Sequence, residues 1–474
     1  MSRFNTLTST KTINLAGGEA YKTTPELELI SILLTSFASD QHYRAADDTF
    51  NRLKSVIKDC DKKFVAQAAV YARNEFGMRS ISHVVASELA KYISGNDWAK
   101  FFYNAVIRRP DDITEILAYH KSVNGKITNA MRKGLAQSFG NFDAYSLAKY
   151  RGEGKDFKLV DAVNILRPKP TQRNAEALKK LVEGTLRSEK TWEAKLTKAG
   201  QTASSENDKQ EKKSQAWASL INSKDLGYMA LLKNLRNILE QSPDLISEVC
   251  CQLTNERAIK KSLVLPFRIA TAYEEVKKLG GGKKVREVMV ALSQAVDISL
   301  NNVPRFDGET LVVLDTSFSM HGKPSEIGSL FSAVLVKANN ADFMTFANHA
   351  EYQSVNILDS TLTIAEQMKF SGGGTNFHSI FETANKVYDR VILLSDMQGW
   401  VGYYAPIQAF NDYKKSTGAN PFVYSFDLAG YGSLQMPEPN VLCLAGFSDK
   451  IFDVMGNLEQ DKNALKRKIQ EVEF

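Results

Sequence analysis

A long run of helical periodicity constrains this fold more than any other feature of the sequence. Between about Thr24 and Leu300, apolar residues recur at three- and four-residue spacing in short segments, and no convincing strand interrupts them. Thr24 can cap the first helix, with Pro25 at its first position. The other helical segments are 64–76, 81–93, 97–108, 122–139, 157–166, 174–186, 214–239, 244–263, 269–279 and 284–300. This series predicts HEAT-like stacked helix pairs, because each pair buries its open face on the next; a plain irregular helical domain is the alternative.

A change of architecture follows this helical run. The polar run 200–213 is interpreted as a flexible loop, and 280–284 as another break. Beyond about residue 304, apolar strands alternate with helices: we expect strands at 309–315, 341–346 and 390–395, and helices at 324–337 and 376–387. Such alternation predicts a parallel, doubly wound α/β sheet. We therefore expect a multidomain chain, with an all-α domain over 1–304 and an α/β domain over 305–474.

Oxygen-bearing side chains gather where the strands of the second domain are expected to end. Asp315, Ser317 and Ser319 alternate along the loop after the first strand, Thr375 follows three glycines, and Asp396 follows the strand 390–395. Because ligands collect at the carboxyl ends of parallel strands, these five residues are predicted to hold one hard divalent cation, Mg²⁺, Mn²⁺ or Ca²⁺. Taken alone, Asp and Ser in such a loop also serve as turn and cap residues.

The three loops carry recognisable motifs. They read DTSFSM, GGGTNF and LLSDMQ, and they resemble the metal-ion-dependent adhesion site of von Willebrand A domains. That family commonly has Gly between the two serines of the first loop, where this sequence has Phe318. The resemblance implies a site that leaves one coordination position for a carboxylate of a partner, which is binding rather than turnover.

Four stretches of the helical part, in order, resemble the TROVE domain of Ro ribonucleoproteins. They are FVAQAAVYARNEFGMRSISHVVASELAK, AYSLAKYRGEGKDFKLVDAVNILRPKP, YMALLKNLRNI and VLPFRIATAYE, and the A-type domain follows them. The resemblance implies a ring of HEAT-like helix pairs closed by the A-type domain. It also implies that the central hole accepts the single-stranded 3′ end of misfolded noncoding RNA, while Y RNA binds the outer surface.

Basic residues supply the candidate RNA-binding surface. Tyr145 and Tyr150 lie among cations in the middle of the chain, a pattern that single-stranded or looped RNA prefers. The candidate RNA-binding residues are Arg132, Lys133, Lys149, Arg151, Lys155, Lys158, Arg167, Lys169, Arg173, Lys233, Arg236 and Arg268. The alternative is a solvated helix surface with core tyrosines, and arginines that pair with nearby acids to hold helices together.

Composition narrows the classes of function. The formal net charge of +6 permits a polyanionic partner without requiring one. There is no apolar stretch of about 18 residues and no secretory signal, so we expect a soluble, cytoplasmic, monomeric protein. The four cysteines, with Cys250 and Cys251 adjacent, predict reduced and mostly buried thiols without a structural zinc site.

Three classes of function compete. The first is a non-catalytic RNA-binding protein for Y-like and misfolded RNA, with a nuclease or another protein as a further partner. The second is a protein-adhesion scaffold that captures a partner carboxylate at the cation site. The third, a metal-dependent hydrolase, is disfavoured because His349 and His378 lack the partners that catalysis needs, and both are interpreted as structural.

Overall fold

The computed structural model describes most of the chain. The described residues are 11–14, 16–21, 24–35, 46–123, 125–187, 192–223, 226–262, 264, 266–303, 305–401, 406–429, 435–436, 440–444, 455 and 464–474. A two-stranded hairpin, β1 (Lys11–Ile13) and β2 (Glu19–Tyr21), precedes the helices. In the part of the chain described, no helix is long and apolar enough to cross a membrane.

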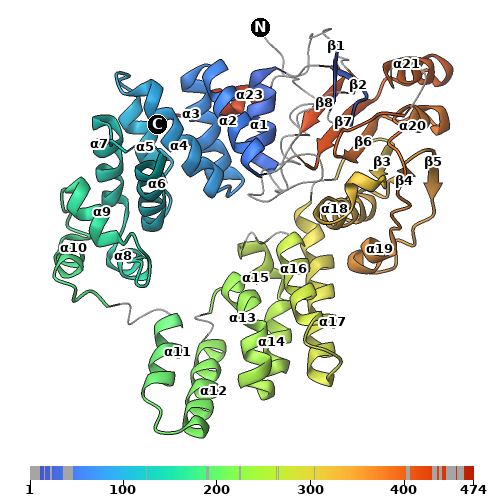
Figure 1. The fold of residues 1–474 in the computed structure, drawn as a ribbon. Coiled ribbons are helices and arrows are strands. Elements are labelled where there is room, and N and C mark those ends of the chain that lie inside the picture. Colours follow the sequence, from blue (N-terminus) through green and yellow to red (C-terminus); the bar gives the residue numbers. More distant parts are fainter. Residues whose placement is uncertain are drawn as a thin grey trace.

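The helical region is a continuous series of short helices (Figure 1). They are α1 (Pro25–Thr35), α2 (Ala46–Asp59), α3 (Lys62–Glu75), α4 (Ser80–Ile93), α5 (Ala99–Ala105), α6 (Pro110–Val123), α7 (Asn129–Ser138), α8 (Ala144–Lys149), α9 (Leu159–Leu166), α10 (Ala175–Val182), α11 (Trp192–Gln201), α12 (Glu206–Asn222), α13 (Tyr228–Gln241), α14 (Ile246–Leu253), α15 (Glu256–Ser262), α16 (Pro266–Lys277) and α17 (Lys283–Ser299). Short 3₁₀ turns, η1 (Phe139–Asn141), η2 (Pro243–Leu245) and η3 (Leu300–Asn302), complete it. Between residues 24 and 300 the described chain contains no strand, as predicted.

Local chemistry explains where several of these helices begin and how they pack. The side chain of Asp61 accepts a hydrogen bond from Phe64 N at 2.8 Å, and that of Asp143 accepts one from Ser146 N at 2.8 Å, so each caps a helix. Gly134 lets α7 lie directly on α5, because a Cβ there would be 2.2 Å from the carbonyl oxygen of Lys100. Small residues and caps therefore fix neighbouring helices in close register.

Several sequence-based boundaries are wrong. The predicted flexible loop 200–213 is a helical hairpin, since α11 ends at Gln201 and α12 starts at Glu206 after the cap Ser205. The ion pair Lys212–Asp208 at 2.9 Å and the stacked rings of Trp192 and Trp217 stabilise it. The predicted helix 214–239 is split between α12 and α13, and 244–263 is split between α14 and α15. The predicted helix 122–139 begins only at Asn129, and α2, α6, α8 and α11 were missed.

The second domain is built on a six-stranded sheet in the order β5-β4-β3-β6-β7-β8. Its strands are β3 (Thr310–Asp315), β4 (Asp342–Phe346), β5 (Ala350–Gln353), β6 (Arg390–Ser395), β7 (Phe422–Asp427) and β8 (Val441–Leu444). All pair in parallel except β5, which is antiparallel to β4 at one edge. The predicted doubly wound fold is confirmed, with an antiparallel edge that was not predicted.

Helices cover both faces of this sheet. They are α18 (Lys323–Asn339), α19 (Thr361–Gln367), α20 (His378–Thr383) and α21 (Pro406–Thr417). Alternate residues of β3 enter two separate cores, with Leu314 in the same cluster as Phe331 of α18 and Val313 in the same cluster as Phe381 of α20. The predicted helix 376–387 is shorter because Ala384 leaves helical geometry with ψ of 115°.

The C-terminal segment of the chain packs on the first helices of the helical series. The last helix, α23 (Ala464–Gln470), returns to α3, where Gln67 Nε2 donates to the carbonyl oxygens of Gln470 and Val472. Phe474 then packs against the rings of Trp98 and Phe102 at 5.7 and 5.9 Å. Figure 1 shows the resulting circuit of helices that begins and ends at the A-type domain. The multidomain fold class is confirmed.

The thiols differ from the prediction. Cys60 is buried, Cys250 is half-buried and Cys251 is exposed, and all three are free. The prediction of a buried thiol is wrong for Cys251, because α14 turns the second residue of the pair to solvent, while the side chain of Cys443 lies outside the described residues.

Candidate RNA interface and cation site

The predicted basic residues in the middle of the chain lie on neighbouring elements. Arg132 and Lys133 are on α7, Lys149 ends α8, and the loop from α8 to α9 carries Arg151 and Lys155. Lys158 caps α9, and Arg167, Lys169 and Arg173 follow it before α10. Apart from Lys149 and Arg151, which are half-buried, the side chains of this set are exposed. α7 contacts α9 and α10 contacts both α8 and α9, so the elements that carry these residues are neighbours; this part of the helical series is termed the corner.

Aromatic rings and cations alternate at this corner. The Lys149 ammonium lies 5.9 Å from the ring centroids of both Tyr145 and Tyr150. The guanidinium of Arg109 lies 4.5 Å from the Tyr150 ring. Tyr145 is 45% exposed, so part of its ring remains open to a ligand. Sequence reasoning missed Arg109, although the pair Arg108–Arg109 directly before α6 was a visible signal of positive charge.

Lys149 is also held in place from another helix. Its ammonium lies 3.3 Å from a carboxylate oxygen of Glu193 on α11. Burial lowers the pKa of Lys149, but the charges of Glu193 and of the neighbouring tyrosines raise it above its usual value. The cation at the centre of the aromatic group therefore stays charged at neutral pH.

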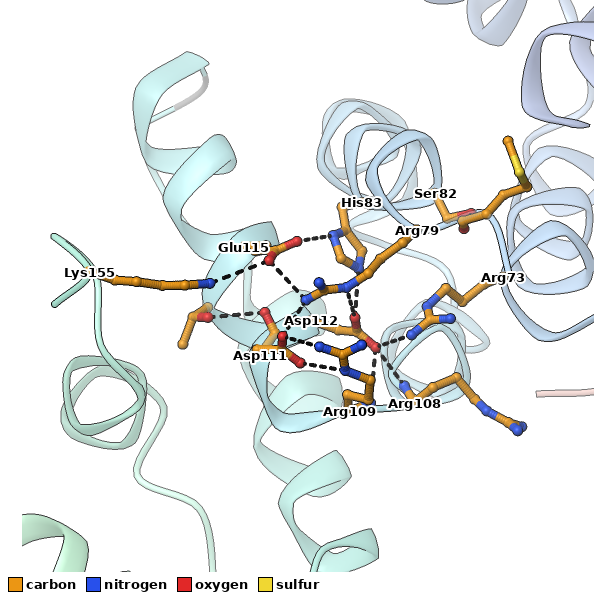
Figure 2. A network of polar contacts seen from close by, with 12 residues as sticks. Arg73, Arg79, Ser82, His83, Arg108, Arg109, Asp111, Asp112, Glu115 and Lys155 are labelled. Atoms are coloured by element: carbon orange, nitrogen blue, oxygen red, sulfur yellow. Dashed lines mark hydrogen bonds and ion pairs between the residues drawn. The ribbon is translucent and has the colours of Figure 1, made fainter. Parts of the chain in front are cut away.

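A buried ionic network lies directly behind this corner (Figure 2). Asp112, fully buried at the start of α6, accepts hydrogen bonds from Arg73 at 2.9 Å, Arg79 at 2.8 Å and His83 at 3.1 Å. It also accepts from the backbone N–H groups of Arg108 and Arg109. One carboxylate thus fixes α3, α4 and the start of α6.

Glu115 connects that network to the candidate RNA surface. Its carboxylate lies 2.8 Å from Arg79, 3.2 Å from His83 and 3.6 Å from Lys155. In Figure 2 Lys155 approaches Glu115 from the loop between α8 and α9. The network contains Arg73, Arg79, Arg109, Lys155 and His83 against Asp111, Asp112 and Glu115, so it adds no negative charge to this corner.

The remaining candidate RNA residues lie elsewhere. Lys233 and Arg236 are exposed on α13, and Arg236 pairs with Glu240 at 3.0 Å. Arg268 is exposed on α16. Burial lowers the pKa of Lys323 on α18, and the nearby charge of Arg268 lowers it further. These three residues therefore form no part of the corner around Tyr150.

Four of the five predicted cation ligands lie at the carboxyl ends of two adjacent strands, and the fifth, Thr375, lies in the loop between α19 and α20. Asp315 ends β3, Asp396 directly follows β6, and β3 pairs with β6. Ser317 and Ser319 have their hydroxyl oxygens 3.4 Å apart. Asp315 accepts hydrogen bonds from Ser317 N at 2.9 Å and from the Ser395 hydroxyl at 2.6 Å. All five ligand candidates are buried.

Backbone hydrogen bonds join the three loops. Gly372 N donates to the carbonyl oxygen of Thr316 at 3.0 Å, and Phe318 N donates to that of Gly373 at 3.2 Å. Trp400 N donates to the carbonyl oxygen of Thr375 at 3.1 Å. Phe318 itself is 61% exposed, and its ring packs on His321.

The donor set fits a hard cation. One carboxylate oxygen of Asp396, Oδ2, is buried without a hydrogen-bond partner. Burial raises the pKa of Asp315, and burial together with the charge of Asp315 raises the pKa of Asp396. Among the described residues no group of three or more His, Cys, Asp or Glu side chains is arranged to hold a metal, so hydroxyls would have to complete the coordination.

Sequence reasoning missed one carboxylate near this site. Asp427 ends β7, and its Cα pairs with that of Ser395. Burial and the charge of Asp315 are the larger causes of the raised pKa of Asp396, and the charge of Asp427 raises it further. The apolar run ending in Asp at the end of β7 was the same signal that identified Asp396.

Comparison with known proteins decides the family. The family model described as the TROVE domain matches residues 29–216 and 155–301, which together span more than half of the chain. The chain belongs to the TROVE domain family. The RNA-binding ribonucleoprotein family expected from the four helical stretches is thereby confirmed.

Relatives of this TROVE protein include much longer chains. Telomerase protein component 1 of Mus musculus is 21% identical over 345 residues, covering 54% of this chain and 13% of that protein. Telomerase protein component 1 of Rattus norvegicus is 22% identical over 136 residues, covering 26% of this chain and 5% of that protein. The matched regions thus span only a small part of these relatives.

A solved structure shares the fold of this TROVE protein. The crystal structure of the Deinococcus radiodurans Ro (RSR) protein matches with a TM-score of 0.63 at 18% sequence identity. The match covers 94% of this chain and 100% of that one. The helical series and the A-type domain are therefore arranged as in that protein.

Proposed function

We propose that this TROVE protein is a non-catalytic RNA-binding protein. It holds small noncoding RNA, Y-like or misfolded with a single-stranded 3′ end, and serves RNA quality control or degradation together with a nuclease partner. The observation that carries the proposal is the alternation of Arg109, Tyr150, Lys149 and Tyr145 on one corner of the helical series. Tyrosine rings bind unstacked bases, and the cations beside them bind phosphates.

Charge supports the same surface. Exposed Lys155, Lys158, Arg167, Lys169 and Arg173 add positive charge beside the aromatic group. Acids pair with three basic residues of this corner: Glu193 with Lys149, Glu153 with Arg151 and Glu115 with Lys155. Phosphate contacts of this kind release counterions, so binding should weaken steeply with salt.

The test is reversal of charge at this corner. Replacing Lys155, Lys158 and Lys169 with Glu should weaken binding of a small structured RNA by at least about 100-fold at low salt and reduce the salt slope. A variant with Lys58, Lys63 and Lys415 changed to Glu has the same net charge and serves as the control, since these exposed lysines lie on other elements. Equal RNA affinity of the two triple variants would reject this surface.

The cation site belongs to the proposal as a second element. Asp315, Ser317, Ser319, Thr375 and Asp396 would hold Mg²⁺ or another hard divalent cation, which supplies an electrophilic position for an oxygen ligand. Titration of the metal-free protein with Mn²⁺, followed by electron paramagnetic resonance, tests the site. Loss of binding in Asp315→Asn is the expected result.

A protein-adhesion scaffold is the second candidate function. It is favoured by Phe318 and Trp400, which are 61% and 53% exposed and contact the glycine loop from neighbouring segments. Exposed aromatic rings beside a cation that accepts a carboxylate would suit an acidic peptide with apolar neighbours. Asp315→Asn should abolish capture of such a peptide and leave RNA affinity unchanged.

A further inference from the structure

The N-terminal hairpin is built around one buried side chain. Asn14 follows β1, and its Oδ1 accepts hydrogen bonds from Ala16 N at 3.0 Å and Gly18 N at 2.9 Å. Its Nδ2 donates to the carbonyl oxygen of Gly399, which lies in the A-type domain. Asn14 therefore forms the turn with one end of its amide and holds a distant loop with the other.

Gly18 brings the two backbones into direct contact. A Cβ at this position would lie 2.0 Å from the carbonyl oxygen of Gly399 and 2.6 Å from the Cα of Trp400. Both obstacles are backbone atoms, which cannot rotate away as a side chain would. Only glycine at this position permits the hairpin to dock as it does.

The contacted loop belongs to the candidate cation site. Gly399 and Trp400 follow Asp396 closely in the chain, and Gln398 N donates to Asp396 Oδ1 at 3.2 Å. Trp400 N donates to the carbonyl oxygen of Thr375, and its ring lies against Gly374. The hairpin therefore supports the segment that joins Asp396 to the loop of Thr375.

We infer that the N-terminal hairpin is a working part of the cation site and that Asn14 is a positioning residue for Asp396. The inference rests on the proposed cation site. A cation fixes Asp396 and Thr375 in one geometry, and the docked hairpin favours that geometry, so cation binding and hairpin docking stabilise each other. Linkage makes this coupling reciprocal. Because β2 leads directly to α1, cation binding also strengthens the junction between the first helix and the A-type domain.

Metal affinity gives the first test. Mn²⁺ titration should show about fivefold weaker binding for Asn14→Ala than for the unaltered chain, because of the three hydrogen bonds that this variant loses only the one to Gly399 reaches the cation site. Asn14→Asp should weaken hairpin docking as well, because its carboxylate keeps the turn but cannot donate to Gly399. Gln67→Ala is the matched control: Gln67 secures the other closure of the ring, at α23, and its loss should leave Mn²⁺ affinity unchanged.

Hydrogen exchange gives the reciprocal test and covers any variant that folds poorly. Mg²⁺ should slow exchange in a peptide spanning residues 11–21 of the unaltered chain, and it should have no such effect in Asp315→Asn. Gly18→Ala should abolish the protection, whereas Gly95→Ala, whose added Cβ meets nothing within 4 Å, should retain it.

The outcomes separate the two proposals. If the unaltered chain binds neither Mn²⁺ nor Mg²⁺, both the proposed cation site and the proposed coupling are rejected. If it binds Mn²⁺ but Asn14→Ala binds equally well, and Mg²⁺ leaves exchange of the hairpin unchanged, the cation site stands and the coupling is overturned.

Discussion

Buried carboxylates occur in both halves of the molecule, but their surroundings are opposite. In the helical region Asp112 contacts Arg73, Arg79 and His83 as well as two backbone N–H groups. In the A-type domain the described residues offer Asp315 hydrogen bonds from neutral groups alone, and among them one buried oxygen of Asp396 has no partner. The pKa values reflect this: burial raises that of Asp112, but its hydrogen bonds to His83 and Arg79 and the charge of Arg73 hold it well below its usual range, whereas burial raises those of Asp315 and Asp396.

This difference separates a carboxylate that stabilises the fold from carboxylates that are suited to bind a ligand. A buried charge is costly unless cations or donors compensate it. Asp112 has its compensation within the chain and organises three helices. Asp315 and Asp396 lack it, so a bound cation would stabilise them.

The largest expected effect is loss of the Asp112 charge. Asp112→Asn keeps the size of the side chain but leaves Arg73 and Arg79 without their shared carboxylate. We expect the free energy of unfolding to fall by about 3–5 kcal/mol, as for other buried pairs that lose one partner. Urea unfolding followed by circular dichroism measures it.

Asp156→Asn is the control for that change, because Asp156 is exposed in the loop between α8 and α9. A loss below about 1 kcal/mol for Asp112→Asn would mean that Asp111 and Glu115 replace Asp112, and that the contrast with the A-type domain is smaller than the contacts indicate.

The second prediction concerns the other half of the comparison. In EDTA, Asp315→Asn should leave stability unchanged or raise it, since it removes one of two neighbouring buried charges. Saturating Mg²⁺ should stabilise the unaltered chain by about 2.7 kcal/mol at 100 times the dissociation constant and should not stabilise the variant. Thermal unfolding in both buffers measures the difference.

A destabilised Asp315→Asn in EDTA would contradict this reading. It would show that the carboxylate, through its bonds to Ser317 and Ser395, serves the fold as Asp112 does. Ser360→Ala, which removes the N-cap of α19, gives the scale of an ordinary polar loss in the same domain.

Sequence reasoning succeeded where a signal is local. The periodicity between residues 24 and 300 and the strand β6 (Arg390–Ser395), whose bounds were predicted, are short-range patterns. The loops after β3 and β6 each follow a strand, so their meeting at one edge of the sheet was also predictable, whereas the glycine loop of Thr375 follows α19 and was identified by its motif alone. Whether they bind a cation stays a prediction.

Sequence reasoning failed where contacts between segments that are distant in the chain determine the structure. α12 is rich in charged residues, and its apolar face is defined by neighbours such as Trp192. α2 is different, because its apolar stripe of Phe50, Leu53, Val56 and Ile57 is a local signal that the sequence analysis overlooked. The contact of Arg109 with Tyr150, and that of Phe474 with Trp98, join distant segments that no periodicity connects. For the same reason the network around Asp112 escaped the sequence analysis, although its members are all visible in the chain.

A third prediction tests the exposed aromatic group against the buried networks. Tyr145→Ala should weaken binding of single-stranded RNA by about 1–3 kcal/mol for the loss of one stacked base, with little change in stability because the ring is partly exposed. Fluorescence anisotropy with a labelled oligonucleotide measures it. Tyr145→Phe keeps the ring and should bind almost normally; an equal loss in both variants would point to the hydroxyl rather than to stacking.

The smallest expected effect is a pH dependence that separates the two kinds of buried site. Burial lowers the pKa of His83, but its hydrogen bonds to Asp112 and Glu115 raise it above the usual 6.5. A group whose pKa is raised in the folded state contributes stability that is complete below 6.5 and is lost as the pH rises through the folded-state value. The carboxylates of Asp112 and Glu115 have lowered pKa values, so their contributions are lost only in acid, outside this window.

The stability difference between the unaltered chain and His83→Gln, measured by urea unfolding, should therefore shrink as the pH rises above 6.5. Because the subtraction cancels the titration of Asp315 and Asp396, a difference that stayed constant with pH would mean that His83 is neutral in the folded chain and that Asp112 is compensated by the arginines alone.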